Sequence, residues 1–275
     1  MQKLVLLAYG TYFNISALIN KKTTARKAFK VFCSPRKGKV LPEQKAYLID
    51  AKDDIVQLGD VHIQTYRWSG SKETVLLAHG WESNTFRWRN LIQKLQTENY
   101  NIVAFDAPAH GHSSGNVLSG PLYAESMQSV IEKYRPKYII GHSFGGMAIL
   151  YNHYKNQNPD IEKMVLLGAP SELTDFMVEY KNLLGLSSRL MSALEDYFTA
   201  NFGMRFVDFS TPKFVQGSSI KGLLIHDELD KITSVKSSEN VHANWKGSIL
   251  IKTKGLGHSL HQDGVRNHVV NFLKS

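Results

Sequence analysis

The sequence predicts an α/β fold in which a mostly parallel sheet carries flanking helices on both faces. Two observations predict this fold. Short apolar runs alternate with helical stretches of about 10 to 15 residues, and one apolar run ends in a glycine-rich turn, at 137–146, that leads into a helix. At 275 residues the chain is long enough for one large domain with a sizeable core. We expect this domain at 43–275 and a basic N-terminal helical segment at 1–42.

The expected elements follow one another along the chain with few interruptions. The first strand alternates polar and apolar residues, and the later strands are nearly continuous apolar runs, which is typical of a parallel sheet buried on both faces. Strands are expected at 61–68, 74–78, 101–105, 138–140, 164–167, 223–225 and 248–251, and helices at 86–97, 122–134, 145–155, 235–243 and 261–273.

One stretch, from Ser171 to about Gly217, breaks the alternation. It is rich in large apolar residues such as Phe176, Phe198 and Phe209. We expect a small helical lid here, at about 171–217, inserted after the sixth strand and lying over the end of the sheet that holds the glycine-rich turn. An apolar lid indicates an apolar substrate portion, although most of these side chains are expected to pack the lid onto the body.

The net charge of the chain belongs to its N-terminal segment. The chain has 33 Lys and Arg against 24 Asp and Glu. Nine of the basic residues lie within 1–42, where no acid precedes Glu43, which leaves 24 basic and 24 acidic residues for 43–275. The main domain is therefore formally neutral, and its charge gives no support for nucleic-acid binding.

Two helices are expected in the N-terminal segment, at Leu4–Asn20 and Thr23–Phe32. The apolar run of the first would span about 24 Å, which is short of a hydrocarbon core of about 30 Å. A signal peptide is disfavoured because Gly10 interrupts the run and no small-x-small cleavage site follows. The apolar faces are expected to dock on the chain's own domain, on a partner or peripherally on an anionic membrane, and periodicity does not choose among these.

A single cysteine, Cys33, excludes an intrachain disulfide. The scarcity of cysteine suits a reducing compartment. We therefore expect a cytoplasmic protein, or one peripheral to the inner face of a membrane. The sequence does not predict an oligomeric state.

The glycine-rich turn, KYIIGHSFGG at 137–146, places Ser143 between a strand and a helix. A serine hydroxyl becomes a nucleophile when a turn holds it out of the sheet, beside a base and near backbone N–H groups. Gly141 and Gly145 provide the small neighbours that such a strained turn requires, and Gly146 lets the helix pack close to the strand. G-x-S-x-G alone is weak, but this context makes Ser143 the candidate nucleophile.

A base and an acid for Ser143 follow it in the chain. A serine nucleophile needs an imidazole base and a carboxylate that fixes the imidazole tautomer. His258 in GLGHS and Asp230 in IHDELD both follow predicted strands by short loops, at the carboxyl end of the sheet, where sites in parallel sheets lie. Asp227 and Asp175 are alternatives for the acid, and His261 is the alternative for the base.

These motifs, in the order Ser, Asp, His, resemble the α/β-hydrolase fold superfamily and its serine esterases and lipases. The resemblance runs from about Val61 to the C-terminus and includes His79-Gly80 after a strand and FDAPAHGHS at 105–113. It implies Asp230 as the triad acid, although family members usually have glycine where Asp227 stands. The backbone N–H of Phe144, after the nucleophile, would form the oxyanion hole, with that of Trp81 added by the resemblance.

The predicted activity is that of a serine hydrolase, in the first place a carboxylic ester hydrolase on apolar acyl or aromatic esters. A small-molecule ester is the expected partner, and neither a metal nor an organic cofactor is needed. His110, His112 and His142 form no recognisable metal-ligand pattern, so we expect no metal site there.

Two alternatives remain open at this point. The same triad would serve a thioesterase or a carbon–carbon bond hydrolase acting on a dienoate-like diketone. Such a diketone hydrolase should bind the substrate carboxylate through basic lid residues, for which Lys181, Arg189 and Arg205 are candidates. The other alternative is a non-catalytic ligand-binding module built on the same fold.

Overall fold

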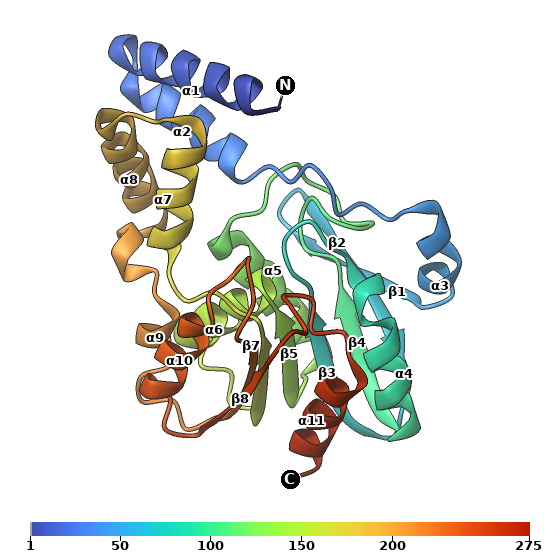
Figure 1. The fold of residues 1–275 in the computed structure, drawn as a ribbon. Coiled ribbons are helices and arrows are strands. Elements are labelled where there is room, and N and C mark those ends of the chain that lie inside the picture. Colours follow the sequence, from blue (N-terminus) through green and yellow to red (C-terminus); the bar gives the residue numbers. More distant parts are fainter. Residues whose placement is uncertain (1) are drawn as a thin grey trace.

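The computed structural model describes residues 2–275, and an eight-stranded sheet runs through its centre (Figure 1). The strands lie in the order β1-β2-β4-β3-β5-β6-β7-β8. From β4 to β8 all neighbours are parallel, whereas β2 pairs antiparallel with both β1 and β4. This confirms the predicted α/β fold. The strands are β1 (Lys52–Leu58), β2 (Val61–Trp68), β3 (Lys72–Ala78), β4 (Tyr100–Phe105), β5 (Tyr138–His142), β6 (Lys163–Leu167), β7 (Lys221–Asp227) and β8 (Ser248–Thr253).

Helices cover both faces of the sheet, which explains why its central strands are apolar throughout. On one face, Val75 and Leu77 of β3 share a core cluster with α4 (Arg89–Thr97) and α11 (Asp263–Lys274). On the other face, Leu76 and Ala78 share a cluster with α5 (Gly120–Tyr134), α6 (Phe144–Asn156) and α10 (Val235–Asn244). Three short helices precede β1 or α4: η1 (Pro42–Gln44), α3 (Lys45–Ile49) and η2 (Thr85–Trp88).

Strand β1 is the strand that the sequence analysis missed. Its sequence, KDDIVQL, is mostly exposed, and a register irregularity lies between Lys52 and Ile55. Charged residues and bulges are common on edge strands because they discourage pairing with other chains. The same charges hide the alternation by which a strand is recognised.

The expected insert after the sixth strand is present between β6 and β7. Its helices are α7 (Leu173–Leu184), α8 (Ser188–Phe202), η3 (Phe206–Asp208) and α9 (Thr211–Phe214). The two expected N-terminal helices are also present, as α1 (Gln2–Ile19) and α2 (Lys21–Phe32). Figure 1 shows α1 and α2 beside α7 and α8, at the end of the molecule away from the C-terminus.

One face of the N-terminal helices packs on the insert. Phe13 and Ala28 are buried in the same core cluster as the apolar residues of α7 and α8. Hydrogen bonds join the two parts as well: the Asn14 side chain donates to the carbonyl of Gly185 at 2.9 Å, and the Tyr180 hydroxyl donates to the carbonyl of Ala28 at 2.9 Å. Docking on the chain's own domain, one of the expected outcomes, is therefore observed for this face. The division into units 1–42 and 43–275 stays a prediction.

Within residues 2–275, every helix is too short or too polar to cross a membrane.

Candidate active site

Ser143 occupies a strained turn between β5 and α6. Its backbone has φ 51° and ψ −123°, a region that residues other than glycine rarely adopt. The neighbours must be small: a Cβ at Gly145 would lie 2.4 Å from the carbonyl oxygen of Ala78, and one at Gly141 would lie 2.7 Å from the amide nitrogen of Gly146. The strain turns the Ser143 side chain out of the sheet and towards a cavity.

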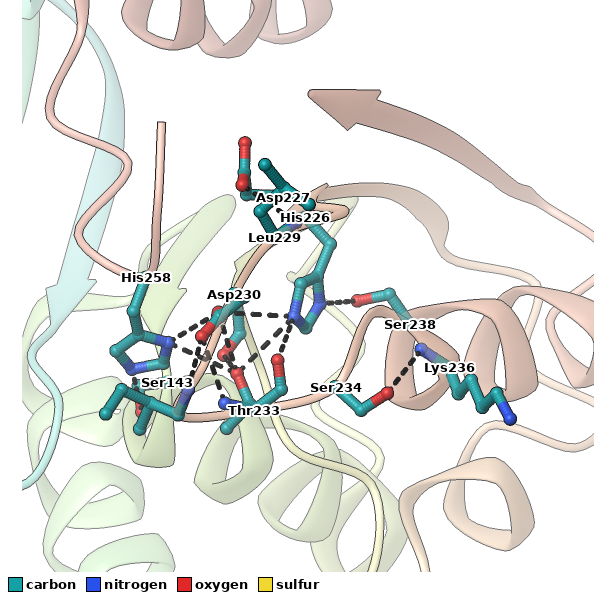
Figure 2. A network of polar contacts seen from close by, with 12 residues as sticks. Ser143, His226, Asp227, Leu229, Asp230, Thr233, Ser234, Lys236, Ser238 and His258 are labelled. Carbon is teal, nitrogen blue, oxygen red and sulfur yellow. Dashed lines mark hydrogen bonds and ion pairs between the residues drawn. The ribbon is translucent and has the colours of Figure 1, made fainter. Parts of the chain in front are cut away.

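His258 and Asp230 form a hydrogen-bonded chain with Ser143 (Figure 2). The Nε2 atom of His258 lies 3.0 Å from Oγ of Ser143, and its Nδ1 atom lies 2.7 Å from Oδ2 of Asp230. His258 stands in the loop between β8 and α11, and Asp230 stands in the loop after β7. With its proton on Nδ1, facing the carboxylate, the imidazole can accept the serine proton at Nε2.

The carboxylate of Asp230 is buried and well supplied with donors. Its Oδ1 atom accepts hydrogen bonds from the amides of Ile232 at 2.8 Å and Thr233 at 3.0 Å, and its Oδ2 atom accepts one from the Thr233 hydroxyl at 3.0 Å. Burial alone would raise the pKa of Asp230. The hydrogen bonds from His258, Thr233 and Ile232 outweigh burial and hold its pKa below the ordinary 3.8. The acid is therefore ionised at neutral pH.

The carboxylate of Asp227, the alternative acid, contacts backbone amides and not the side chain of His258. Its carboxylate accepts hydrogen bonds from the amides of Leu229 at 3.0 Å, Gly255 at 3.2 Å and Leu256 at 2.8 Å. It thus links the loop that carries Asp230 to the loop that carries His258. The other alternative acid, Asp175, is exposed on α7.

Two other histidines near the site differ in what they contact. The ring of His142 packs against that of His258, with ring centroids 4.8 Å apart, and its Nε2 atom donates to the backbone carbonyl of His258 at 2.8 Å. Burial lowers the pKa of His142 well below 6.5, so this ring stays neutral. His261, the alternative base, lies near Arg87 and Arg266 on another surface hollow, and no hydrogen bond joins it to Ser143 in the described part of the chain.

Trp81 and Phe144, whose amides are expected to form the oxyanion hole, line the same cavity as Ser143. Phe144 is the first residue of α6, so its N–H has no acceptor inside the helix. A Cβ at Gly80 would lie 3.1 Å from Cβ of Ser143, which shows how close the end of β3 comes to the turn. Nδ1 of His79 donates to the carbonyl of Gly80 at 2.7 Å, which fixes the orientation of the Gly80–Trp81 peptide. The oxyanion role of both amides stays a prediction.

An apolar cavity of about 250 Å³ lies beside Ser143. The insert contributes Phe176 and Phe198 to its lining, and the N-terminal segment contributes Phe29, Phe32 and Cys33. Sequence reasoning missed this contribution of residues 1–42, because it depends on contacts between distant parts of the chain. Burial raises the pKa of Cys33 to about 12, so the thiol is neutral.

The basic residues considered for carboxylate binding lie elsewhere. Lys181, Arg189 and Arg205 do not line the cavity, and within 2–275 no charged side chain does. Nε of Arg205 lies 3.3 Å from the carboxylate of Glu195.

The chain belongs to the alpha/beta hydrolase family, whose model matches residues 75–231. It is 22% identical over 262 residues to an uncharacterized hydrolase, YugF, of Bacillus subtilis, a match that covers 78% of this chain and 94% of that protein. Its fold is similar to that of an esterase from Exiguobacterium antarcticum, with a TM-score of 0.62, 18% identity and coverage of 80% and 99% of the two chains. It is about as similar to a meta-cleavage product hydrolase from Pseudomonas fluorescens, with a TM-score of 0.61, 18% identity and coverage of 81% and 98%.

Proposed function

We propose that the protein is a serine hydrolase that cleaves carboxylic esters with an apolar acyl or aromatic portion. The observation that carries this proposal is the chain of hydrogen bonds from Ser143 through His258 to Asp230, which ends beside an apolar cavity. A membership of the alpha/beta hydrolase family supports hydrolysis as the reaction class.

In the proposed mechanism, Ser143 attacks the ester carbonyl while His258 takes its proton at Nε2. The amides of Trp81 and Phe144 donate to the oxyanion, and each such donor is worth about 3 kcal/mol in the transition state. Protonated His258, held by ionised Asp230, then gives the proton to the leaving alcohol. Water, deprotonated by His258, releases the acid from the acyl-enzyme. The helical insert would act as the lid that keeps bulk water from the acyl group.

The uncharged lining favours an ester over a substrate with its own carboxylate. A dienoate-like diketone carries such a carboxylate, and burying it without a paired charge costs several kcal/mol. The fold itself does not distinguish ester hydrolysis from carbon–carbon bond hydrolysis, because an esterase and a meta-cleavage product hydrolase are almost equally similar to this chain in structure. Thioesters would fit the cavity as well as oxygen esters do, so a thioester series belongs in the same assay.

The first prediction concerns Ser143→Ala and p-nitrophenyl esters of increasing acyl length. We expect wild-type turnover, and a loss of kcat of about 10⁴-fold or more in the variant, because the covalent route is removed. Ser192→Ala, at an exposed serine of α8, is the control and should keep full activity. Circular dichroism establishes that all three proteins are folded.

A fluorophosphonate probe tests the same proposal without a substrate. It should label wild type and Ser192→Ala, and leave Ser143→Ala unlabelled. If the folded wild type hydrolyses none of the esters and is not labelled, the serine hydrolase proposal fails and a ligand-binding module of the same fold takes its place.

A further inference from the structure

Helix α1 exposes an apolar stripe on the side opposite to the insert. The stripe recurs every three or four residues, so its members share one face of the helix. The buried residues Gly10, Phe13 and Ala17 lie on the opposite face. Ile15 is 58% exposed and Ile19 is 87% exposed. The stripe consists of Val5, Tyr9, Tyr12, Ile15 and Ile19.

Helix α2 adds a basic face at the same end of the molecule (Figure 1). This basic face consists of Lys22, Arg26, Lys27 and Lys30, all exposed. None of the four forms an ion pair with an acid of residues 2–275, and residues 1–42 contain no acid. The segment therefore presents positive charge next to uncovered apolar surface.

An anionic phospholipid surface is the partner that fits both features. Apolar side chains of an interfacial helix enter the boundary between head groups and acyl chains, and tyrosines favour that depth. Lysines near a negatively charged leaflet attract it strongly and in a salt-dependent way. A second copy of this chain fits less well, because two acid-free basic segments would repel each other when brought together.

Helix α2 also lines the cavity beside Ser143. Phe29 and Phe32 contribute to that lining, and Ala28, which precedes Phe29, is buried and accepts the hydrogen bond from Tyr180 of the insert. One helix thus carries positive charge towards solvent and also forms part of the cavity wall. A membrane bound at the basic face would therefore lie within one helix diameter, about 10 Å, of the cavity wall.

We propose that the apolar stripe of α1 and the basic face of α2 form a docking surface for anionic membranes. The helices lie in the plane of the interface, and α2 holds the cavity wall next to the lipid. A second part of the proposal rests on the proposed function. It is that the esters hydrolysed at Ser143 are amphiphilic lipids that enter the cavity from the bound membrane.

The test is flotation of the full chain with vesicles. Vesicles of phosphatidylcholine containing phosphatidylserine should bind the wild type at low salt, and binding should weaken as salt rises. Pure phosphatidylcholine vesicles should bind it much less. Equal binding to both compositions, or none to either, would overturn the docking proposal.

Matched variants assign the binding to the surface. Ile15→Glu should abolish flotation, whereas Ile49→Glu, at an isoleucine of α3 that is 61% exposed, should not. The triple change Lys22→Gln, Lys27→Gln and Lys30→Gln should weaken binding on the order of 100-fold. The control with the same net charge, Lys236→Gln, Lys246→Gln and Lys254→Gln, removes exposed lysines of the main domain and should bind as the wild type does.

Activity separates this proposal from the proposed function. Ile15→Glu should hydrolyse soluble short-chain esters at the wild-type rate, and lose most of its activity on a long-chain ester embedded in anionic vesicles. If the protein floats with the vesicles but hydrolyses no ester, the hydrolase proposal fails and the docking proposal stands. A different result would replace the membrane by a second copy of the chain as the partner of this surface. In that case the wild type hydrolyses soluble esters but does not float with vesicles, and sedimentation velocity shows a dimer that Ile15→Glu converts to a monomer.

Discussion

Asp227 shows how one carboxylate can matter to a site without contacting it. It accepts backbone hydrogen bonds from the loop of Asp230 and from the loop that leads to His258. Burial would raise its pKa, but the hydrogen bonds from Leu256, Thr253 and Leu229 together lower it below 3.8. The distance between Asp230 and His258 therefore depends on an ionised Asp227.

We expect Asp227→Asn to be impaired in activity and stability. The new amide group must face backbone N–H groups, which leaves donors unsatisfied at a cost of about 1–3 kcal/mol. The free energy of unfolding should fall by that amount, and kcat should fall about 10- to 100-fold as His258 shifts. Ester kinetics and urea unfolding measure both. Glu228→Gln, at the exposed neighbouring acid, is the control, and equal behaviour of the two variants would contradict the positioning role.

The residues of the site differ in how far sequence predicts them. Ser143 is marked by a local pattern, since its turn needs glycines at fixed positions. Asp230 and His258 follow from strand ends and family resemblance, and the structure brings both to Ser143. The contacts of His142 and Asp227 depend on loops that meet only in the folded sheet, and no spacing in the chain encodes them.

Helix α2 forms part of the cavity wall, so a change there should alter the preferred acyl length. Phe32 lines the cavity and packs on Tyr180 with ring centroids 5.0 Å apart. In Phe32→Ala the space left by the ring should admit longer chains. We expect the optimum to move to longer esters, with each added CH₂ worth up to about 0.8 kcal/mol in kcat/KM.

A p-nitrophenyl ester series measures the shift in optimum. The control is Phe202→Ala, which removes a ring of α8 that packs on Phe29 but does not line the cavity. It should cost stability and leave the optimum unchanged. An unchanged optimum in Phe32→Ala would show that the N-terminal segment does not limit the bound acyl chain.

Lys163 caps the last turn of α11. This lysine is buried, and its Nζ atom donates to the carbonyls of Phe272 at 3.1 Å and Leu273 at 2.8 Å. The carbonyls at a helix C-terminus lack intrahelical donors and attract positive charge. Lys163→Met should therefore lower the free energy of unfolding by about 1–3 kcal/mol.

Urea unfolding compares this variant with Lys274→Met. Lys274 forms only an exposed ion pair with Glu98, which is worth less than about 1 kcal/mol. If the two variants lose the same stability, the buried lysine does not act as a cap.

Helices and strands are easier to predict from the sequence than the segments on which they pack. The helices of 1–42 and most strands follow from apolar periodicity, whereas β1 escapes it because its charges suit a sheet edge. That α1 and α2 pack on α7 and α8 is a matter of surface complementarity between segments far apart in sequence. A local sequence pattern predicts which face of such a helix is apolar, but it does not predict which segment of the chain packs on that face.

Several buried histidines make the whole molecule sensitive to acid. Burial, with the neighbouring His110, lowers the pKa of His79 to about 3, and burial lowers that of His142 well below 6.5. As the pH falls below about 6, the unfolded chain binds protons at these positions and the folded chain does not. The free energy of unfolding should therefore fall as pH falls, by about 3 kcal/mol per pH unit for two such groups.

Urea unfolding at pH 6, 5.5 and 5 measures this slope, which is smaller between pH 7 and 6 because the unfolded histidines are then only partly protonated. In His142→Asn the slope should be smaller by about 1.4 kcal/mol per pH unit. Asp227 and Asp230, whose folded pKa values are lowered, add to the loss only below about pH 4. A free energy of unfolding that stays constant from pH 7 to 5 would contradict the neutral burial of these histidines.

The packing of α1 and α2 on the insert also sets an order of events during synthesis on the ribosome. Ala28 and Asn14 bond to residues that lie 152 and 171 positions later in the chain. At a translation rate of about 5 to 20 residues per second, those partners emerge roughly 8 to 34 s after the helices do. The two helices are made before the insert and therefore wait for their native contacts, so their apolar faces stay uncovered by the insert while the first strands of the sheet form.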